Sequence, residues 1–286
     1  MRPLSFASES KRSPLRARRR RARILAGLGM FTVLVAAAYG VSYASYLPQF
    51  TVQRIEVLGV ENIRPALIRA FVATKFASGS YKFLSESNIF LYSRAEIESA
   101  VKEYFSRVAD VKVSRESLFA TSVTVLVEER TSFARWCEAN TEALASCYAM
   151  DGTGFVFAPI ASTSPGFQTP YVFEGALSAT SAPVGQQYLP STFSALLALL
   201  ERLGQAGYSP EHIVVEGAQD FSIHLARNFA LRASFGMDIG SLIRNFELIL
   251  SSEALRDREG ELEYIDLRFG NRVYYKLKGS EQQSVQ

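Results

Sequence analysis

The sequence predicts an α+β protein with one membrane-spanning helix near its N-terminus and two extramembrane domains. Three observations lead to this fold class. A long uncharged run follows a basic N-terminus, runs with helical and with strand periodicity follow it, and short strands separated by turn signals dominate the second half. At 286 residues, 48 % of them hydrophobic, the chain is long enough for two domains and too apolar to be wholly disordered.

The formal net charge of +3 conceals a strong segregation of charge. Residues 1–23 hold nine Lys or Arg and one acidic residue, whereas the rest of the chain holds 22 basic and 27 acidic residues. Basic residues that flank a membrane helix favour its cytoplasmic side. We therefore expect a basic cytoplasmic tail over 1–23 and a folded body outside. Because topology accounts for the charge, we expect no nucleic-acid ligand.

An uncharged run of 24 residues extends from Ile24 to Leu47. As a helix it is long enough to cross a hydrocarbon core of about 30 Å. Tyr39, Tyr43 and Tyr46 crowd its far end, as amphipathic rings do at a membrane interface. A cleaved secretory signal is the alternative, since Ala36–Ala38 resemble a cleavage site. The run is longer than the roughly 15 residues of a signal core, which favours a retained anchor over 24–47.

The segment after the membrane helix is expected to fold as a β-α-α-β-β unit. Asn62 is positioned to cap the first helix, with Pro65 in its first turn. Ser93 is positioned to cap the second helix, and Glu96 three residues later completes a capping-box pattern. Alternating apolar residues predict the strands at 50–59, 108–115 and 122–130.

A second, β-rich domain is expected from about Thr131, with helices packed on a mostly antiparallel sheet. Apolar residues at helical spacing predict one helix over 191–203 and another that Asp238 caps. Short apolar or alternating runs predict strands within 133–136, 147–157, 171–173, 212–217, 220–226, 229–235 and 264–278.

The two cysteines, Cys137 and Cys147, flank a polar loop between two short strands. Disulfides persist outside the cytoplasm, so a bond that closes this hairpin is the favoured interpretation. A metal site is disfavoured because two thiols ten residues apart have no nearby histidine to help them.

We find no constellation that predicts catalysis. His212 and His224 are the two histidines, and His224 lies in an alternating strand, which favours a structural role. The D-G-T-G run at 151–154 has the wrong order for an aspartic protease loop, and Asp-Gly between strands predicts a turn. We therefore expect no enzyme activity, no cofactor, no metal and no small-molecule substrate, and a binding function instead.

The order of motifs along the chain resembles the FtsQ/DivIB family of bacterial cell-division proteins, from about residue 11 to 278. After the basic tail and single span, the segments resemble the family's POTRA domain, its transition into a second domain and its terminal strand pair. These segments read I-E-V-L-G-V-E-N-I, S-N-I-F-L, R-A-E-I-E-S-A-V-K, V-A-D-V-K-V-S-R, S-V-T-V-L-V-E-E-R, T-S-F-A-R-W, A-M-D-G-T-G-F-V-F and I-D-L-R-F-G-N-R-V-Y-Y-K.

This resemblance implies a non-enzymatic scaffold at the division septum, anchored in the inner membrane, with FtsB- and FtsL-like partners. A POTRA-containing protein of transport or envelope assembly is the alternative. The expected domains are the tail 1–23, the membrane helix 24–47, the POTRA domain 48–130, the β domain 131–278 and a C-terminal tail 279–286.

The resemblance also implies that a partner strand adds to the last strand of the sheet. Gly270-Asn271 predicts a tight turn. We expect the strand after it, 272–277, to lie at a sheet edge with unpaired main-chain groups, where Lys276 and Lys278 discourage indiscriminate pairing. A blunted edge strand without a partner is the alternative. The partner-binding residues implied are Arg268, Phe269, Gly270, Asn271, Arg272, Val273, Tyr274 and Tyr275.

Overall fold

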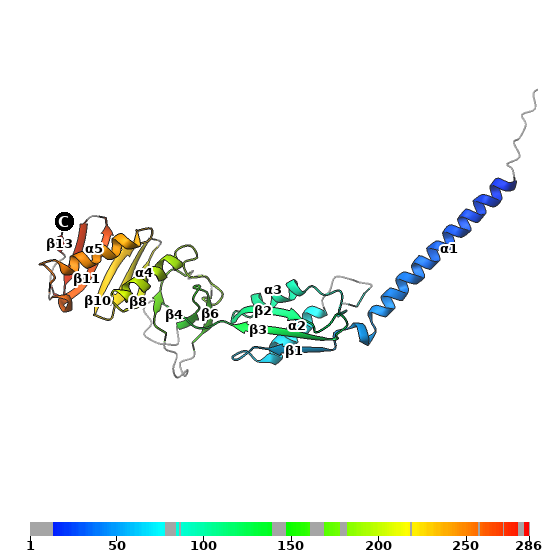
Figure 1. Cartoon of the computed structure of the whole chain (residues 1–286), viewed down its shortest axis with the longest axis horizontal. Helices are drawn as coiled ribbons and strands as arrows, with labels where there is room; N and C mark the ends of the chain where they lie inside the picture. Colours follow the sequence, from blue (N-terminus) through cyan, green and yellow to red (C-terminus); the bar gives the residue numbers. More distant parts are fainter. Residues whose placement is uncertain are drawn as a thin grey trace, which may run out of the picture. The chain divides into compact units, whose positions relative to one another are not determined.

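The computed structural model describes residues 14–77, 84–85, 87–138, 147–160, 169–177, 182–217, 219–256, 258–270, 272–279 and 283–285. It divides into two compact units (Figure 1). One unit comprises Met1–Val101 with Val111–Val127, and the other comprises Lys102–Asp110 with Glu128–Gln286. The expected class is confirmed at a coarse level, because the chain is α+β with one apolar N-terminal helix and a large mixed sheet.

Helix α1 (Pro14–Ser45) begins in the basic tail and contains nearly all of the uncharged run. Within the described part of the chain, Arg18–Ser45 is the one helix long and apolar enough to cross a membrane. Large apolar side chains are exposed along the whole length of the helix: Leu25 and Phe31, for example, are 69 % and 65 % exposed. The core helix of a soluble protein would bury such side chains, so α1 is consistent with a membrane anchor.

Five elements follow in the expected order, with most of their residues in the first unit. They are β1 (Arg54–Leu58), α2 (Pro65–Phe76), α3 (Arg94–Tyr104), β2 (Val108–Ser114) and β3 (Ser122–Glu129). The sheet order is β1-β3-β2, and β1 runs parallel to β3. Val123, Val125 and Val127 of β3 are buried in alternation, because successive side chains of a strand face opposite sides.

Two expected starts in this unit are wrong. The first strand begins at Arg54 rather than at residue 50, because Pro48–Phe50 form a 3₁₀ turn (η1). Asn62 does not cap α2, whose N-cap is Arg64 without a side-chain bond. Pro65 occupies the first helical position instead, where its missing N–H costs nothing.

Both other caps are present. The Ser93 hydroxyl accepts a hydrogen bond from the Glu96 N–H at 3.3 Å, at the start of α3. The Asp238 carboxylate accepts one from the Ser241 N–H at 2.8 Å, at the start of α5. These bonds satisfy helix donors that have no intrahelical partner.

The second unit contains a ten-stranded sheet in the order β13-β12-β11-β10-β9-β8-β7-β4-β5-β6. Its strands are β4 (Ala134–Cys137), β5 (Cys147–Met150), β6 (Val156–Pro159), β7 (Val172–Glu174), β8 (Pro210–Glu216), β9 (Asp220–Leu225), β10 (Phe229–Ser234), β11 (Leu262–Phe269), β12 (Arg272–Leu277) and β13 (Gln283–Val285). The helices are α4 (Phe193–Gln205) and α5 (Ile239–Ser251), and a 3₁₀ turn, η3 (Glu259–Glu261), precedes β11.

Most neighbouring strands in this sheet are antiparallel, but three pairs are parallel: β4 with β7, β7 with β8, and β10 with β11. Helix α4 lies between β7 and β8 in the chain, and α5 lies between β10 and β11 (Figure 1). Parallel neighbours need a crossover connection, usually a helix, so each helix follows from the pairing of the strands that it joins.

One face of the large sheet is packed against both helices. A single buried cluster combines α4 and α5 with residues that alternate along the strands, such as Ile213 of β8, Ile223 of β9 and Leu231 of β10. The intervening residues, such as His212, His224 and Arg232, therefore lie on the opposite face. The core thus fixes which side chains this second face presents.

Candidate functional site

The sequence places the candidate site at the C-terminal end of the large sheet, in the hairpin of β11 and β12. These strands pair antiparallel, with Ile265 opposite Tyr275 and Asp266 opposite Tyr274. Gly270 lies in the turn with φ of 68°, a conformation that glycine adopts without strain. Asn271, the other expected turn residue, lies outside the described residues.

The expectation that β12 forms a free edge is wrong. Strand β13 pairs antiparallel with it, with Val273 opposite Val285, Tyr274 opposite Ser284 and Tyr275 opposite Gln283. The last strand in the order is therefore β13, which belongs to the segment expected to be a C-terminal tail, 279–286. Edge main-chain groups gain hydrogen bonds from any strand within reach, and the chain's own C-terminal segment supplies that strand here.

The sequence carries little signal for β13. Residues 283–285 read Q-S-V, with one apolar residue and no alternation. Gly279, with φ of 76°, is the one hint, since it permits a turn after β12. This three-residue strand forms because β12 offers it an edge to pair with, and not because its own sequence has strand periodicity. The sequence pattern therefore does not predict it.

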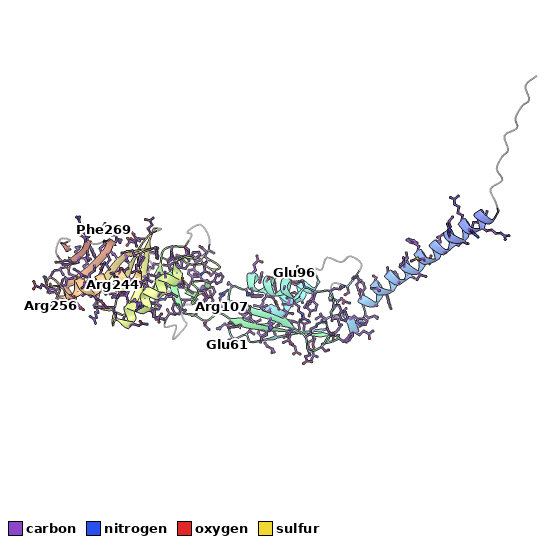
Figure 2. The ribbon with its side chains drawn as sticks, turned by 45° about the horizontal axis from the view of Figure 1, so that its top comes forward. Glu61, Glu96, Arg107, Arg244, Arg256 and Phe269 are labelled. Atoms are coloured by element: carbon purple, nitrogen blue, oxygen red, sulfur yellow. A yellow bond between two sulfur atoms is a disulfide. The ribbon has the colours of Figure 1, made fainter. Side chains whose placement is uncertain are left out.

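The predicted partner-binding side chains divide between the two faces of the sheet. Tyr275 is only 5 % exposed in the main core, and Val273 packs partly buried against that core. Phe269 is 52 % exposed and lies at the surface (Figure 2). Its ring meets Tyr274 edge to face at 5.0 Å between centroids. These two rings and the exposed Arg272 remain available to a partner, whereas Tyr275 supports the fold.

Arg268 belongs to an ionic network that ties the inner strands together. Its Nη2 donates to Asp266 Oδ2 at 2.7 Å and its Nη1 to Asp220 Oδ2 at 2.8 Å. The Ser234 hydroxyl also donates to Asp220, at 2.7 Å. The bonds to Asp266, and then to Asp220, raise the pKa of the Arg268 guanidinium although burial opposes them. Arg268 therefore clamps β9 to β11.

Bonds from Ser234 and then from Arg268 lower the pKa of Asp220 below its ordinary value. Asp266 is almost fully buried, at 2 % exposure. A buried carboxylate needs such a partner, because an unpaired charge is costly away from water. Positions 268 and 266 thus have a structural role within the chain.

Lys276 and Lys278, expected to discourage indiscriminate strand pairing at the edge, both contact oxygen atoms of this chain. Lys276 Nζ lies 2.9 Å from Glu263 Oε2, and Lys278 Nζ donates to the Gly260 carbonyl at 3.0 Å. Both bonds reach toward β11 and the turn before it, on the side away from β13. The ion pair of Lys276 with Glu263 is partly exposed to solvent and contributes little stability. We therefore expect the two contacts to orient the lysines more than to stabilise the hairpin.

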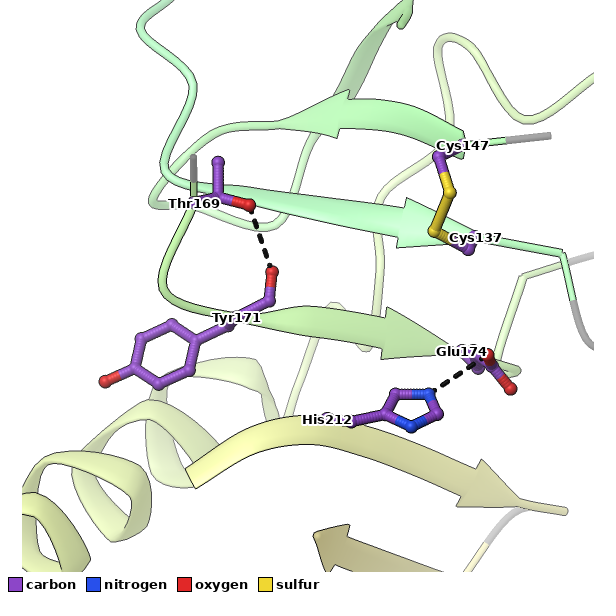
Figure 3. Close-up of a disulfide and its surroundings, with 6 residues drawn as sticks. All are labelled: Cys137, Cys147, Thr169, Tyr171, Glu174 and His212. Atoms are coloured by element: carbon purple, nitrogen blue, oxygen red, sulfur yellow. Dashed lines mark hydrogen bonds and ion pairs between the residues drawn. A yellow bond between two sulfur atoms is a disulfide. The ribbon is translucent and has the colours of Figure 1, made fainter. Parts of the chain in front are cut away.

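The other end of the sheet is fastened covalently. Cys137 of β4 and Cys147 of β5 are directly opposite in the register and form a disulfide (Figure 3). The adjoining turn is also tied down: Asp151 Oδ2 lies 2.5 Å from Arg130 Nη1, and Asp151 Oδ1 accepts from the N–H groups of Thr153 and Phe155. Burial raises the pKa of Asp151, but the bond from the Thr153 hydroxyl, and then those from Phe155 and Arg130, outweigh it and leave the pKa lowered. The expected Asp-Gly turn is present here.

His212 and His224 lie side by side on neighbouring strands, with ring centroids 5.3 Å apart. His212 Nε2 is 3.0 Å from Glu174 Oε1 (Figure 3). Burial, and then the neighbouring His212, lower the pKa of His224. The pair stacks on the face of the sheet away from the helices, in keeping with the structural role expected of His224.

No group of three His, Cys, Asp or Glu side chains that could hold a metal ion occurs among the described residues. The best-defined candidate for a functional surface is the C-terminal end of the sheet, where Phe269 of β11 and Arg272 and Tyr274 of β12 lie on a hairpin whose second strand pairs with the chain's own β13. Neither a scan against protein-family models nor a search of curated proteins gives a match to this chain.

Proposed function

We propose that the chain is a non-enzymatic, membrane-anchored scaffold of the bacterial cell-division machinery that binds FtsB- and FtsL-like partners by strand addition to β12. The order of the sequence motifs supports this function, as does a single apolar helix followed by a β-α-α-β-β unit, which we interpret as a POTRA domain. The basic tail favours an N-terminus in the cytoplasm and a body outside the inner membrane. A division scaffold with this topology would act at the septum.

The observation that carries the proposal is the pairing of β13 with β12. This edge already accepts an antiparallel strand over Val273 to Tyr275. The chain's own segment thus occupies the place that a partner strand would take. Main-chain bonds provide affinity in such recognition, and adjacent side chains provide selectivity. The exposed Phe269 and the half-buried Tyr274 supply aromatic surface beside this position.

A partner strand can exchange with β13 because β13 is short. It pairs over three residues of a strand that spans six, Arg272–Leu277. A longer incoming strand forms more main-chain bonds, each worth roughly 0.5–1.5 kcal/mol. The linkage of β13 to β12 favours the chain's own strand through effective concentration. Anchoring of both proteins in one membrane offsets part of that advantage.

Site-specific photo-crosslinking in the native bacterium tests the site. A photoreactive amino acid replaces Tyr274, beside β13, or Leu248, a 67 % exposed residue of α5 that serves as the control. We expect adducts with a small single-pass membrane protein at position 274 and none at 248. Equal adduct yields at the two positions would contradict strand addition at this edge.

Depletion of the chain from its native bacterium tests the cellular role. A division scaffold predicts filamentous cells with unconstricted septa, restored by the intact chain. Defects in envelope permeability or protein export without filamentation would favour the alternative, a POTRA-containing protein of transport or envelope assembly.

A further inference from the structure

An exposed apolar cluster lies in the first unit, and one of its residues, Phe50, follows shortly after the end of α1 in the chain. It comprises Phe50, Phe90, Leu118 and Phe119, which we term the juxtamembrane cluster. Phe90, Leu118 and Phe119 are 51 %, 70 % and 69 % exposed. The Phe90 ring lies 6.3 Å from Phe50 and 5.9 Å from Phe119, between centroids. Single exposed apolar residues are ordinary, but a contiguous cluster indicates a contact surface.

Main-chain bonds hold this cluster next to the start of the first unit. The Ile89 N–H donates to the Phe50 carbonyl at 2.9 Å, which places the 87–91 segment beside η1. The Gln53 N–H donates to the Thr121 carbonyl at 2.8 Å, which places the segment of Leu118 and Phe119 there as well. The cluster is therefore formed by three chain segments joined through their backbones.

Two further bonds connect the cluster to α1 itself. Asn88 Nδ2 donates to the Ser45 carbonyl at 3.2 Å, and the Ser85 N–H donates to the Ser45 hydroxyl at 2.9 Å. Ser45, Ser85 and Asn88 are all buried, at 5–6 % exposure. The last residue of α1 and the loop that carries Phe90 are thus packed together.

The short path from α1 limits how far the cluster can lie from the bilayer. The apolar run ends at Leu47, and Phe50 follows after three residues, a reach of at most about 10 Å. The headgroup layer of a bilayer is roughly 5–8 Å thick on each side. Aromatic rings favour this layer, and Tyr46, exposed at the end of the apolar run, is suited to it as well.

We propose that the juxtamembrane cluster is a lipid-binding surface that inserts into the headgroup layer of the membrane that α1 spans. Arg115 adds a cation suited to lipid phosphate: its guanidinium lies 5.9 Å from the Phe90 ring centroid, and its Nη1 donates to the Leu118 carbonyl at 3.2 Å. Lipid contact removes the exposed rings from water and restrains the first unit at the membrane surface. This inference rests on α1 as a membrane anchor.

Depth-dependent quenching in nanodiscs tests the proposal on the full chain. Because Cys137 and Cys147 are disulfide-bonded, one introduced cysteine can be labelled selectively with a bimane fluorophore. The reporter is Phe119→Cys. The matched control is Leu126→Cys, which replaces an apolar residue of β3 that is 51 % exposed and lies roughly 20 Å further along the chain. Nanodiscs contain phosphatidylcholine and phosphatidylglycerol, with or without doxyl-labelled lipid, and one copy of the chain.

We expect doxyl lipid to quench the label at position 119 at least twofold more than at 126, with a blue-shifted emission at 119. Equal quenching at the two positions, whether strong or weak, overturns the proposal. A blue shift at 119 without quenching also overturns it, because it indicates protein contact instead of lipid. Leu34→Cys, within α1, separates the premise from the inference: quenching at 34 but not at 119 leaves the anchor intact and removes the lipid-binding surface.

Discussion

The two ends of the ten-stranded sheet are held in different ways. At the β4–β5–β6 end, a disulfide joins adjacent strands and the Arg130–Asp151 pair secures the following turn. At the β12–β13 end, main-chain pairing over three residues holds the final strand. A covalent bond fixes the first end in one arrangement, whereas three paired residues can separate and re-form.

This difference suggests that one end of the sheet is fixed and the other can change its strand pairing. The ionic clamp formed by Arg268, Asp266 and Asp220 lies inward of the β12–β13 end and ties β9 to β11. Because the clamp holds β11 and β12 pairs antiparallel with β11, loss of β13 would leave both strands with a neighbour on the inner side. Strand exchange needs such an arrangement, because the receiving strand must stay ordered while its neighbour leaves.

The largest effect should come from breaking the clamp. Arg268→Ala leaves the buried Asp266 without its cation, so we expect the free energy of unfolding to fall by about 2–4 kcal/mol. Chemical denaturation of the full chain in detergent measures the change. The matched control is Lys276→Ala, which removes a more exposed ion pair and should cost less than about 1 kcal/mol. Equal losses for the two variants would show that the clamp has no special role.

Removal of the disulfide should come next. The double variant Cys137→Ser/Cys147→Ser opens a loop of ten residues, for which chain entropy predicts a loss of about 2–3 kcal/mol. Hydrogen exchange should quicken in β4, β5 and β6 and stay unchanged in β12 and β13. Faster exchange at both ends would mean that the sheet unfolds as one unit, which contradicts the comparison.

The elements that the sequence predicted best are those with a long repeating signal. The apolar run of α1, the alternating valines of β3 and the amphipathic helices α4 and α5 lie where their periodicity placed them. The caps at Ser93 and Asp238 were also predictable, because a side-chain cap depends only on residues three positions apart.

The elements that escaped prediction depend on distant partners. Strand β13 exists because β12 offers an edge, and Q-S-V alone carries no strand pattern. The Arg268 clamp joins Arg268 to Asp220, which are 48 positions apart in the sequence. No local sequence pattern can predict such a contact. The sequence therefore suggested a candidate site at the terminal hairpin, but it did not predict that β13 covers β12, nor which side chains there already have a structural role.

Deletion of residues 280–286 tests whether β13 competes with a partner strand. If β13 occupies the edge about nine-tenths of the time, its removal raises the apparent partner affinity about tenfold. The measurement is the cross-link yield from a photoreactive residue at position 274 in cells. Ser284→Pro should reproduce much of the gain because proline disrupts pairing of β13, and Ser284→Ala is the matched control that keeps the main chain unchanged.

A lower cross-link yield after the deletion would contradict exchange. It would mean that the partner adds to the outer edge of β13, which would then be part of the binding surface. An unchanged yield would mean that the segment and the partner do not meet at this edge.

The smallest effect concerns acid stability at the turn near the disulfide and at the ionic clamp. Asp151 and Asp220 both have a pKa below the ordinary 3.8 in the folded chain. Each therefore contributes stability that is present above the unfolded pKa and is lost as the pH falls through the folded pKa.

Asp151, with 10 % of its side chain exposed against 37 % for Asp220, should contribute more because water screens it less. We expect Asp151→Asn to flatten the fall in stability below about pH 4 more than Asp220→Asn does, as measured by thermal unfolding between pH 3 and 7. If Asp220→Asn had the larger effect, the ionic clamp, and not the turn near the disulfide, would determine how the stability of the sheet falls at acid pH.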